Sequence, residues 1–292
     1  MDYAQDSTLF DVLAVLLDPR KARGKRHPWL LLLTVLAAGL ASGQQTAHAI
    51  ARWVVLHADT LRTALPDPIR LPSESTLLRT LRQIDHQVLE HAVAQLNQPQ
   101  TPAEERADRV VTPVGTILQA QTVDGKAARG ATACGMATHL VSLVGHGRGV
   151  VLAQAAVERK RSDLSAVPAL LRGRDLTDTV ITMDALLTHR ALAQQIIDQH
   201  GYSLMIVTAN QARLRDNLAW FFDYPAIAAD PDRERWDRVQ TVTRAHGRLE
   251  IRTLDCTTGD CTWLGWPGAT HVARRTCERH VLKTGRVSRA VT

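Results

Sequence analysis

The spacing of apolar residues changes character after about residue 97. Before that point apolar side chains recur every three to four positions, which is the period of an amphipathic helix, as in Leu9, Val12, Leu13 and Leu16. The apolar run from Trp29 to Ala41 and the face of Ile50, Trp53 and Val54 continue the pattern. Since no alternating stretch interrupts it, the pattern predicts an all-helical N-terminal domain over residues 1–98.

A further helix is predicted near the end of this region. The segment Pro72–Ser75 carries hydroxyl groups that are typical helix caps, so a helix is expected to follow through Leu77–Ile84. Arg79 and Arg82 lie three positions apart on that helix and therefore share a face. We expect this face either to contact phosphate groups or to stay solvated.

Residues 98–112 combine prolines with charged side chains and are predicted to form a linker. Beyond it the period becomes two, with β-branched composition, which predicts strands at 115–123, 139–145 and 150–157, the last two joined by a turn at His146–Gly149. Helices are then expected at 164–171, 189–200 and 211–222, and they alternate with strands at 179–183 and 203–207.

This order of elements matches a ribonuclease-H-like fold, with a mixed sheet flanked by helices over residues 113–292. The predicted fold class is α+β or α/β. A general α/β domain is the alternative, because one sequence does not give the order of strands in space. Two more alternating stretches, 235–244 and 248–256, flank a hairpin turn at Ala245–Gly247. The basic tail from Thr270 is expected either to bind DNA or to be a solvated chain end.

The charge balance favours a polyanionic partner. The chain of 292 residues has 35 Lys and Arg against 29 Asp and Glu, a net charge of +6. Nucleic acid is the leading candidate, and a basic housekeeping enzyme is the alternative. Glycine-rich phosphate loops, Gly-x-Ser-x-Gly elbows and His-Glu-x-x-His motifs are missing from the sequence, which disfavours a small-molecule enzyme.

Cysteine usage and the apolar run favour a cytoplasmic protein. The four cysteines are too unevenly spaced for a disulfide framework, which indicates a reducing compartment. A zinc site of Cys256, Cys261, Cys277 and His280 lacks the usual tight spacing, so buried thiols are the preferred interpretation. The run from Trp29 to Ala41 is too short for a membrane span and too far from the N-terminus for a signal sequence.

Two acidic residues occupy positions suited to metal chemistry. Asp124 follows the first predicted strand and Asp184 the fourth, where adjacent strands can bring two carboxylates together. Hard divalent cations prefer oxygen ligands, and such ions support phosphodiester chemistry. Because Asp-Gly is also a common turn and a strand-end Asp a common cap, the spacing alone leaves both interpretations open.

An ordered series of motifs is spread over nearly the whole chain. In the N-terminal half the motifs are Asp18–Arg20, Gly24–Pro28, Ala49–Trp53 and Pro72–Thr76. In the remainder they include Val123–Lys126 with Arg129–Gly130, His139–Ser142, Lys160, Ala166–Leu171, Thr182–Leu186, Asn210–Gln211, His246–Arg252, Trp266–Gly268 and Thr284–Ser288. This series resembles the H-repeat-associated DDE transposases of the ISAs group of insertion sequences.

The resemblance implies that Asp124 and Asp184 are the first and second carboxylates of a DDE triad that binds Mg²⁺ or Mn²⁺. Lys126 and Arg129 would then contact phosphate or pair with a local acid. Asn210 and Gln211 would contact the DNA backbone or cap a helix. The implied partner is double-stranded DNA, at transposon ends and target, in the bacterial nucleoid, with no membrane. A homo-oligomer is left open.

Two departures from the family bear on activity. Thr208 stands where the family usually has lysine, and the chain stops at Thr292, before the helical motif that supplies the third acid. We therefore expect a C-terminally truncated, catalytically impaired transposase. Asp163 or Glu250 could replace the third ligand, although such ligands normally come from a helix aimed at the site. The alternative is a relic that binds DNA or an intact transposase without catalysis.

Overall fold

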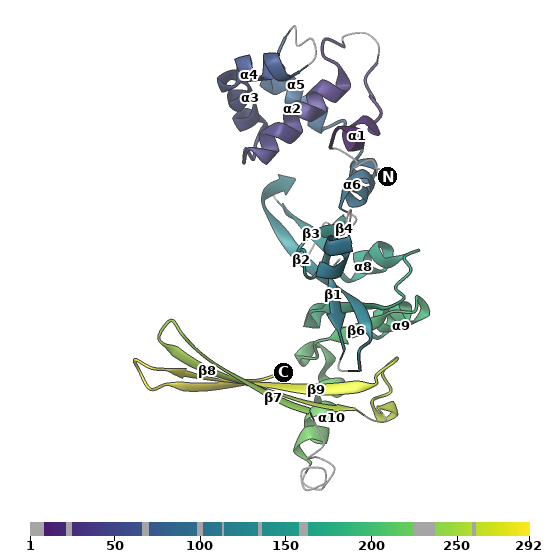
Figure 1. Cartoon of the computed structure of the whole chain (residues 1–292), viewed down its shortest axis with the longest axis vertical. Coiled ribbons are helices and arrows are strands. Elements are labelled where there is room, and N and C mark those ends of the chain that lie inside the picture. The colour runs from purple at the N-terminus through teal and green to yellow at the C-terminus, as the bar shows by residue number, and fades with distance from the viewer. Residues whose placement is uncertain are drawn as a thin grey trace. The chain divides into compact units, whose positions relative to one another are not determined.

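The computed structural model describes residues 9–21, 25–65, 70–97, 102–112, 114–133, 136–157, 163–224, 237–258 and 261–292. The chain divides into two compact units. The first comprises Met1–Glu105 with Val150–Ala153, and the second comprises Arg106–Gly149 with Gln154–Thr292. Figure 1 shows helices in the first unit and two sheets in the second.

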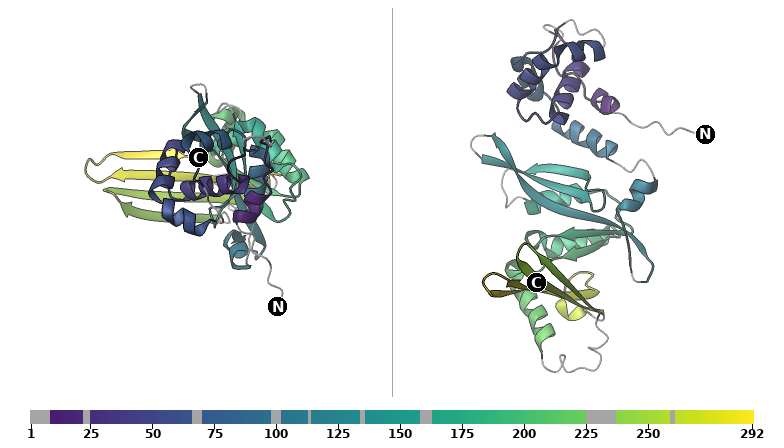
Figure 2. Two further views of the ribbon diagram at one scale, coloured as in Figure 1. Left: turned by 90° about the horizontal axis from the view of Figure 1, so that it is seen from above. Right: turned by 60° about the vertical axis from the view of Figure 1, so that its left-hand side comes forward.

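Six helices form the described part of the chain between residues 9 and 97. They are α1 (Leu9–Ala14), α2 (Trp29–Ala41), α3 (Ala47–Leu56), α4 (Ala58–Ala64), α5 (Glu74–Leu81) and α6 (His86–Leu96). Helix α2 contacts α1, α3 and α5, and the bundle is seen again in the right-hand view of Figure 2. Its apolar run is buried in two hydrophobic clusters, as predicted for a core helix. Among the described residues we find no helix long and apolar enough to cross a membrane.

Close packing of α2 on α3 depends on a glycine. A Cβ atom at Gly39 would lie 2.8 Å from Cγ2 of Ile50, which is closer than carbon atoms can pack. Glycine is unfavourable within a helix by about 1 kcal/mol relative to alanine. Here its missing side chain lets Ile50, which is 2% exposed, fill the space between the two helices.

The polar residues of two motifs in the first unit form hydrogen bonds with residues close to them in sequence. Asp18 accepts hydrogen bonds from the backbone and guanidinium nitrogens of Arg20 and forms an ion pair with Lys25 at 2.9 Å. The hydrogen bond from the Arg20 side chain is the main cause that holds the pKa of Asp18 well below its usual range.

Ser73 is the N-cap residue of α5, but the predicted hydroxyl cap is wrong, because its Oγ bonds the hydroxyls of Ser75 and Thr76 instead.

A six-stranded mixed sheet forms the centre of the second unit. Its strands are β1 (Arg109–Val111), β2 (Ile117–Ala133), β3 (Met136–Gly145), β4 (Val151–Val157), β5 (Thr179–Met183) and β6 (Tyr202–Met205). The order is β4-β3-β2-β5-β6, and β1 pairs with β2. Strand β3 is antiparallel to β2, whereas β5 is parallel to both β2 and β6. The predicted mixed sheet of at least five strands is therefore confirmed.

Helices α8 (Asp163–Leu171) and α9 (Arg190–Asp198) pack beside this sheet and against each other (Figure 1). Along β5 the burial alternates, with Thr179, Ile181 and Met183 buried and the residues between them only partly so. One face of the sheet is thus closed, while the other is partly open at the level of these strands.

Two sequence predictions about this sheet are wrong. Residues 98–112, predicted to be a linker, contain helix α7 (Pro102–Ala107) and strand β1. Proline is favoured in the first turn of a helix, and β1 is fixed by pairing with β2, which local sequence does not reveal. Strand β2 also continues to Ala133, so Asp124 does not stand at the end of a strand as predicted.

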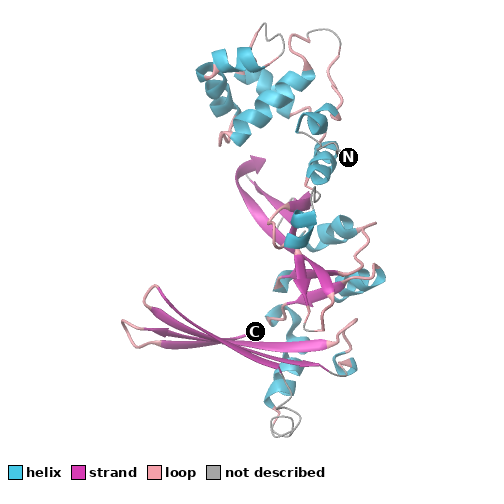
Figure 3. Cartoon of the chain, in the orientation of Figure 1, coloured by secondary structure: helices cyan, strands magenta, loops and turns pink. Residues whose placement is uncertain are grey.

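A second, antiparallel sheet of four strands follows helix α10 (Ala212–Asp223). Its strands are β7 (Asp237–Ala245), β8 (Arg248–Thr258), β9 (His271–Val281) and β10 (Val287–Val291), shown in magenta in Figure 3. The predicted hairpin turn is confirmed: His246 and Gly247 both have positive φ, at 48° and 70°, as a two-residue hairpin turn requires. The basic tail is not a frayed end, because it forms β9 and β10.

One end of the second sheet is anchored to α10. Phe222, Cys261 and Val272 form a buried cluster between the helix and the sheet. Arg274 lies 5.0 Å above the Phe222 ring and pairs with Asp223 at 2.6 Å. Such a mixture of apolar contact and charge pairing fixes one end of the sheet and leaves β7 exposed along its whole length.

A buried ion pair closes the turn between β3 and β4. Oδ1 of Asp108 accepts the backbone N–H groups of Gly147 and Arg148 at 2.9 and 2.8 Å, and Oδ2 accepts Nε of Arg148 at 2.6 Å. Asp108 is 5% exposed. A Cβ at Gly147 would overlap the carbonyl oxygen of Ala107, so only glycine fits this turn against the chain before β1.

Removing the Asp108 carboxylate should destabilise the second unit. Asp108→Ala removes the acceptor of two backbone N–H groups and of the Nε–H of Arg148, so we expect a loss of about 3 kcal/mol in the free energy of unfolding. Urea unfolding at neutral pH measures it. Asp59→Ala is the control, because the Asp59–Arg62 pair is solvent-exposed and should contribute nothing measurable. An equally small effect at Asp108 would contradict the role given to the turn.

The same ion pair should make the stability of the second unit depend on pH. Burial raises the pKa of Asp108, but the hydrogen bonds from Arg148 and Gly147 lower it by more, so the pKa lies below 3.8. A carboxyl group with a lowered pKa stabilises the fold above its unfolded-state pKa and loses this effect as pH falls through the folded-state pKa. The stability difference between the wild type and Asp108→Ala should hold from pH 7 to about 4 and shrink below it. A difference that has already vanished at pH 5 would contradict this.

Candidate functional site

An aspartate follows the paired part of both β2 and β5. The last paired residues are Val123 and Met183; Asp124 is the next residue within β2, and Asp184 directly follows the end of β5. Paired strands lie about 4.8 Å apart, and successive side chains alternate between the faces. Asp124 and Asp184 therefore lie at the same end of two neighbouring strands, and Asp124 is on the side of the sheet opposite the buried Val123. Both are exposed to solvent.

Different local structures hold the two carboxylates. Strand β2 continues past Asp124 and keeps it in register with Ser142 of β3, so its backbone is fixed on one side by the sheet. Strand β5 ends at Met183, and Asp184 caps the short 3₁₀ helix η2 (Ala185–Leu187) by accepting the N–H of Leu187 at 3.1 Å. The position of Asp184 therefore depends on the loop that follows it.

Lys126 lies beside the acidic pair. Its Nζ is 3.8 Å from Oδ2 of Asp124, and its side chain is 83% exposed. Two positions apart on a strand, Lys126 and Asp124 share a face. A contact so exposed adds little stability, which leaves the ammonium group accessible to an anion. The side chain of Arg129 lies outside the described residues.

The side chains of Asn210 and Gln211 bond to a neighbouring loop rather than cap a helix. Both residues lie in η3 (Ala209–Gln211), directly before α10, and Gln211, the N-cap residue of α10, makes no side-chain cap hydrogen bond. Instead Nδ2 of Asn210 donates to the carbonyl of Ala185, and Nε2 of Gln211 donates to the carbonyl of Thr188 at 2.9 Å. Both amides thus bind the loop after Asp184. Their contact with DNA remains a prediction.

Sequence reasoning missed Thr188. This residue is 1% exposed, and its hydroxyl lies 2.6 Å from the carbonyl oxygen of Ile206 and 3.2 Å from that of Asp184. It therefore joins the loop after β5 to the loop after β6. A threonine between a strand and a helix carries no sequence signal for this role, because the partner lies 18 residues away.

No third acid joins the pair among the described residues, where no group of three or more His, Cys, Asp or Glu side chains is placed to hold a metal ion. This finding also rules out the grouping of Cys256, Cys261, Cys277 and His280. Glu250 lies on β8, where Arg279 donates to it at 2.8 Å and Arg252 also pairs with it. The Arg279 hydrogen bond holds the pKa of Glu250 below its usual range. The side chain of Asp163 lies outside the described residues.

The acidic pair nevertheless fits a magnesium-type ion. In proteins Mg²⁺ is usually bound by one or two carboxylates together with water and substrate phosphates, rather than by a full cage of protein ligands. Asp124 and Asp184, both exposed and at the same end of neighbouring strands, are ligands of the type that such an ion takes. They also stand at the carboxyl ends of the paired segments of parallel strands, where α/β sheets commonly bind ligands.

Arg79 and Arg82 lie in the first unit. Both side chains are exposed, on α5 and at its C-cap, and Nε of Arg79 donates to the carbonyl of Ser75 at 3.2 Å. The shared exposed face is as predicted. Whether it binds phosphate stays a prediction.

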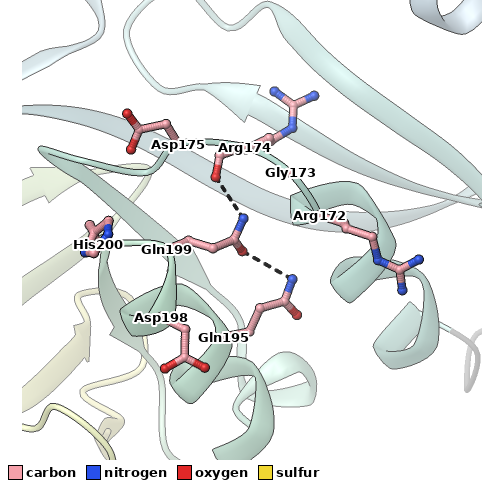
Figure 4. Close-up of a pocket in the computed structure, with 8 residues that line it drawn as sticks. All are labelled: Arg172, Gly173, Arg174, Asp175, Gln195, Asp198, Gln199 and His200. Carbon is pink, nitrogen blue, oxygen red and sulfur yellow. Dashed lines mark hydrogen bonds between the residues drawn. The ribbon is translucent and has the colours of Figure 1, made fainter.

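A depression in the second unit lies elsewhere. It has a volume of about 500 Å³ and is lined by residues 172–175 and by Gln195, Asp198, Gln199 and His200 (Figure 4). Nε2 of Gln199 donates to the carbonyls of Leu171 and Arg174, so part of the polar lining is already bonded within the chain. These residues precede β5 and β6, at the amino ends of the strands. The depression is thus separate from the acidic pair.

Comparison with known proteins agrees with the sequence motifs. A protein-family model described as DDE_Tnp_1-associated matches residues 10–96. The “Uncharacterized protein in dhlA 3'region” of Xanthobacter autotrophicus is 28% identical over 258 residues, which cover 86% of this chain and 82% of the relative. “Putative transposase YncI” of Escherichia coli O157:H7 is 28% identical over 255 residues, which cover 84% of this chain and 60% of the relative.

Two further similarities are shorter or more distant. “H repeat-associated putative transposase YhhI” of Escherichia coli K12 is 29% identical over 116 residues, 40% of this chain and 30% of the relative. The piggyBac transposase synaptic complex with hairpin DNA has a TM-score of 0.35 at 9% identity, covering 90% of this chain and 55% of its own, and is too distant to bear on the fold. The family match and the named relatives together confirm the resemblance to the H-repeat-associated DDE transposases.

Proposed function

We propose that this chain is a DNA transposase whose mixed-sheet unit is a ribonuclease-H-like catalytic domain, acting with Mg²⁺ or Mn²⁺ in strand cleavage and transfer at transposon ends. The observation that supports the proposal is the register of β2 with β5, which ends at Val123 and Met183, so that Asp124 and Asp184 follow at the same end of neighbouring strands. Sixty residues of sequence separate them. Two exposed acids at such neighbouring positions have no structural benefit, because like charges on neighbouring strands repel.

Asp124 and Asp184 would hold the divalent ion, with the remaining ligands coming from substrate phosphate and water. A bound ion supplies positive charge that activates the attacking oxygen and stabilises the leaving oxygen. The chain itself contributes the spacing of the two carboxylates and a cation beside them. Lys126, now 3.8 Å from Asp124, would turn toward a phosphate oxygen of the DNA, and Arg129 would assist it.

The lack of a third acid among the described residues favours a second candidate function. In that case the chain binds DNA, or an intact transposase, without cutting. A centre with two carboxylates should in any case bind metal weakly and turn over slowly, so the two functions are separated by whether any cleavage depends on Asp124 and Asp184.

Cleavage of DNA that carries the element ends tests the proposal. We expect slow, Mg²⁺-dependent or Mn²⁺-dependent nicking by the full chain, and a fall to background in Asp124→Asn and Asp184→Asn, because an amide is a poor ligand for a hard cation. Asp184→Asn preserves the cap of η2, whereas Asp184→Ala would also cost about 1 kcal/mol of stability.

Asp198→Asn is the matched control, since it removes an exposed carboxylate from α9 and should leave nicking unchanged. Nicking that persists in both asparagine variants would overturn the proposed active site. DNA binding without any metal-dependent nicking would favour the non-catalytic function.

DNA affinity should depend steeply on salt. Each phosphate contact contributes about −0.9 to the slope of log K against log salt, so Arg79→Gln with Arg82→Gln should reduce the slope by about 2 if both arginines bind phosphate. Fluorescence anisotropy over a salt series measures the slope. Arg62→Gln is the control, as this exposed arginine on α4 is paired with Asp59. An unchanged slope in the double variant would exclude this face from the DNA interface.

A further inference from the structure

Three side chains fasten the loop after β5 to the loop after β6. Asn210 donates to the carbonyl of Ala185, Gln211 donates to that of Thr188, and the Thr188 hydroxyl bonds the carbonyl of Ile206. The two loops follow adjacent parallel strands, and backbone pairing between those strands ends at Met183 and Met205. Beyond that point these side chains replace the sheet as the connection.

The fastened loop is the one that carries Asp184. Its carboxylate accepts one hydrogen bond from Leu187, within η2, so the side chain follows any movement of that helix. The backbone carbonyl of Asp184 also accepts from Thr188. Asp124 needs no such support, because β2 runs on through it as a paired strand. The distance between the carboxylates therefore depends on what holds η2.

Thr208 orients one of the two amides. The carbonyl of Ala185 can only accept a hydrogen bond, so the Nδ2 end of the Asn210 amide must face it. The Oδ1 end then faces the Thr208 hydroxyl, which lies 2.8 Å away and donates to it. The Thr208 hydroxyl thus fixes the orientation of the Asn210 side chain.

From this geometry we infer that Asn210, oriented by Thr208, and Gln211 are positioning residues, which hold Asp184 at the spacing from Asp124 that one divalent ion requires. The inference rests on the proposed function. It gives the Asn-Gln pair a part in metal binding that does not involve contact with DNA. Residues that orient metal ligands commonly change metal affinity by 10-fold to 100-fold when replaced.

Mn²⁺ binding to the full chain, followed by the EPR signal of free Mn²⁺, tests the inference without any cleavage assay. Asn210→Leu and Gln211→Met remove the donors while keeping similar side-chain volume. We expect the apparent Kd for Mn²⁺ to rise about tenfold in each. Gln194→Met is the matched control, because it removes an exposed glutamine amide on α9 that bonds Asp198 rather than the loop. Its Kd should equal that of the wild type.

Conservative replacements and deuterium exchange separate positioning from general stability. Thr208→Ser keeps the hydroxyl and should retain wild-type Mn²⁺ affinity, whereas Thr208→Val should weaken it. Exchange in peptides covering residues 184–189 should be faster in Asn210→Leu and Gln211→Met than in Gln194→Met, without metal and with thermal unfolding midpoints matched to the wild type. This combination supports positioning, since a general loss of stability would speed exchange throughout the unit.

Two negative results differ in meaning. If the wild type binds Mn²⁺ through Asp124 and Asp184, as their asparagine variants report, and yet Asn210→Leu and Gln211→Met bind it equally well, the positioning role is wrong while the proposed function stands. If Asp124→Asn and Asp184→Asn do not alter Mn²⁺ binding, the proposed metal site fails, and the inference falls with it.

Discussion

The pairing of β2 with β5 is the constraint on which the proposed site depends. It joins two segments that are 60 residues apart and fixes which side chains face which side of the sheet. A register slip of one residue would move every side chain of a strand to the opposite face. The buried positions Val123, Ile181 and Met183 resist such a slip, because it would expose them and bury Thr182 and Asp184. The apolar core on one face thus sets the position of the acids on the other.

A sheet can specify such positions only as far as its strands are paired. Asp124 lies within a strand that continues, but Asp184 lies just beyond one, and there the chain uses side-chain hydrogen bonds to backbone carbonyls. Bonds of this kind, between Gln211 and Thr188 for example, are made between groups that would otherwise bind water, so each adds only about 1 kcal/mol to stability. These hydrogen bonds matter for where they hold the loop rather than for their strength, since each fixes the loop at one atom.

The sequence predicted elements that are decided locally and missed those decided by distant partners. Strand β5 was predicted with its observed bounds because its five residues are β-branched or apolar and lie between turn signals. Strands β9 and β10 were interpreted as a basic tail, because their arginines conceal an alternation that is stabilised by pairing of β9 with β8 and of β10 with β9. The placement of Asp124 and Asp184 at the same end of neighbouring strands could be expected from strand order, but the amide contacts of Asn210 could not, since they depend on how two loops meet.

The most direct test of the central claim is the anomalous scattering of Mn²⁺ in crystals of this chain. The account predicts one strong peak within bonding distance, about 2.0 to 2.3 Å, of an oxygen from Asp124 and an oxygen from Asp184, with the other ligands being water. The peak should vanish in crystals of Asp184→Asn grown in the same way. A peak bound to only one of the two aspartates, or a strong peak elsewhere and none between them, would contradict a shared metal site.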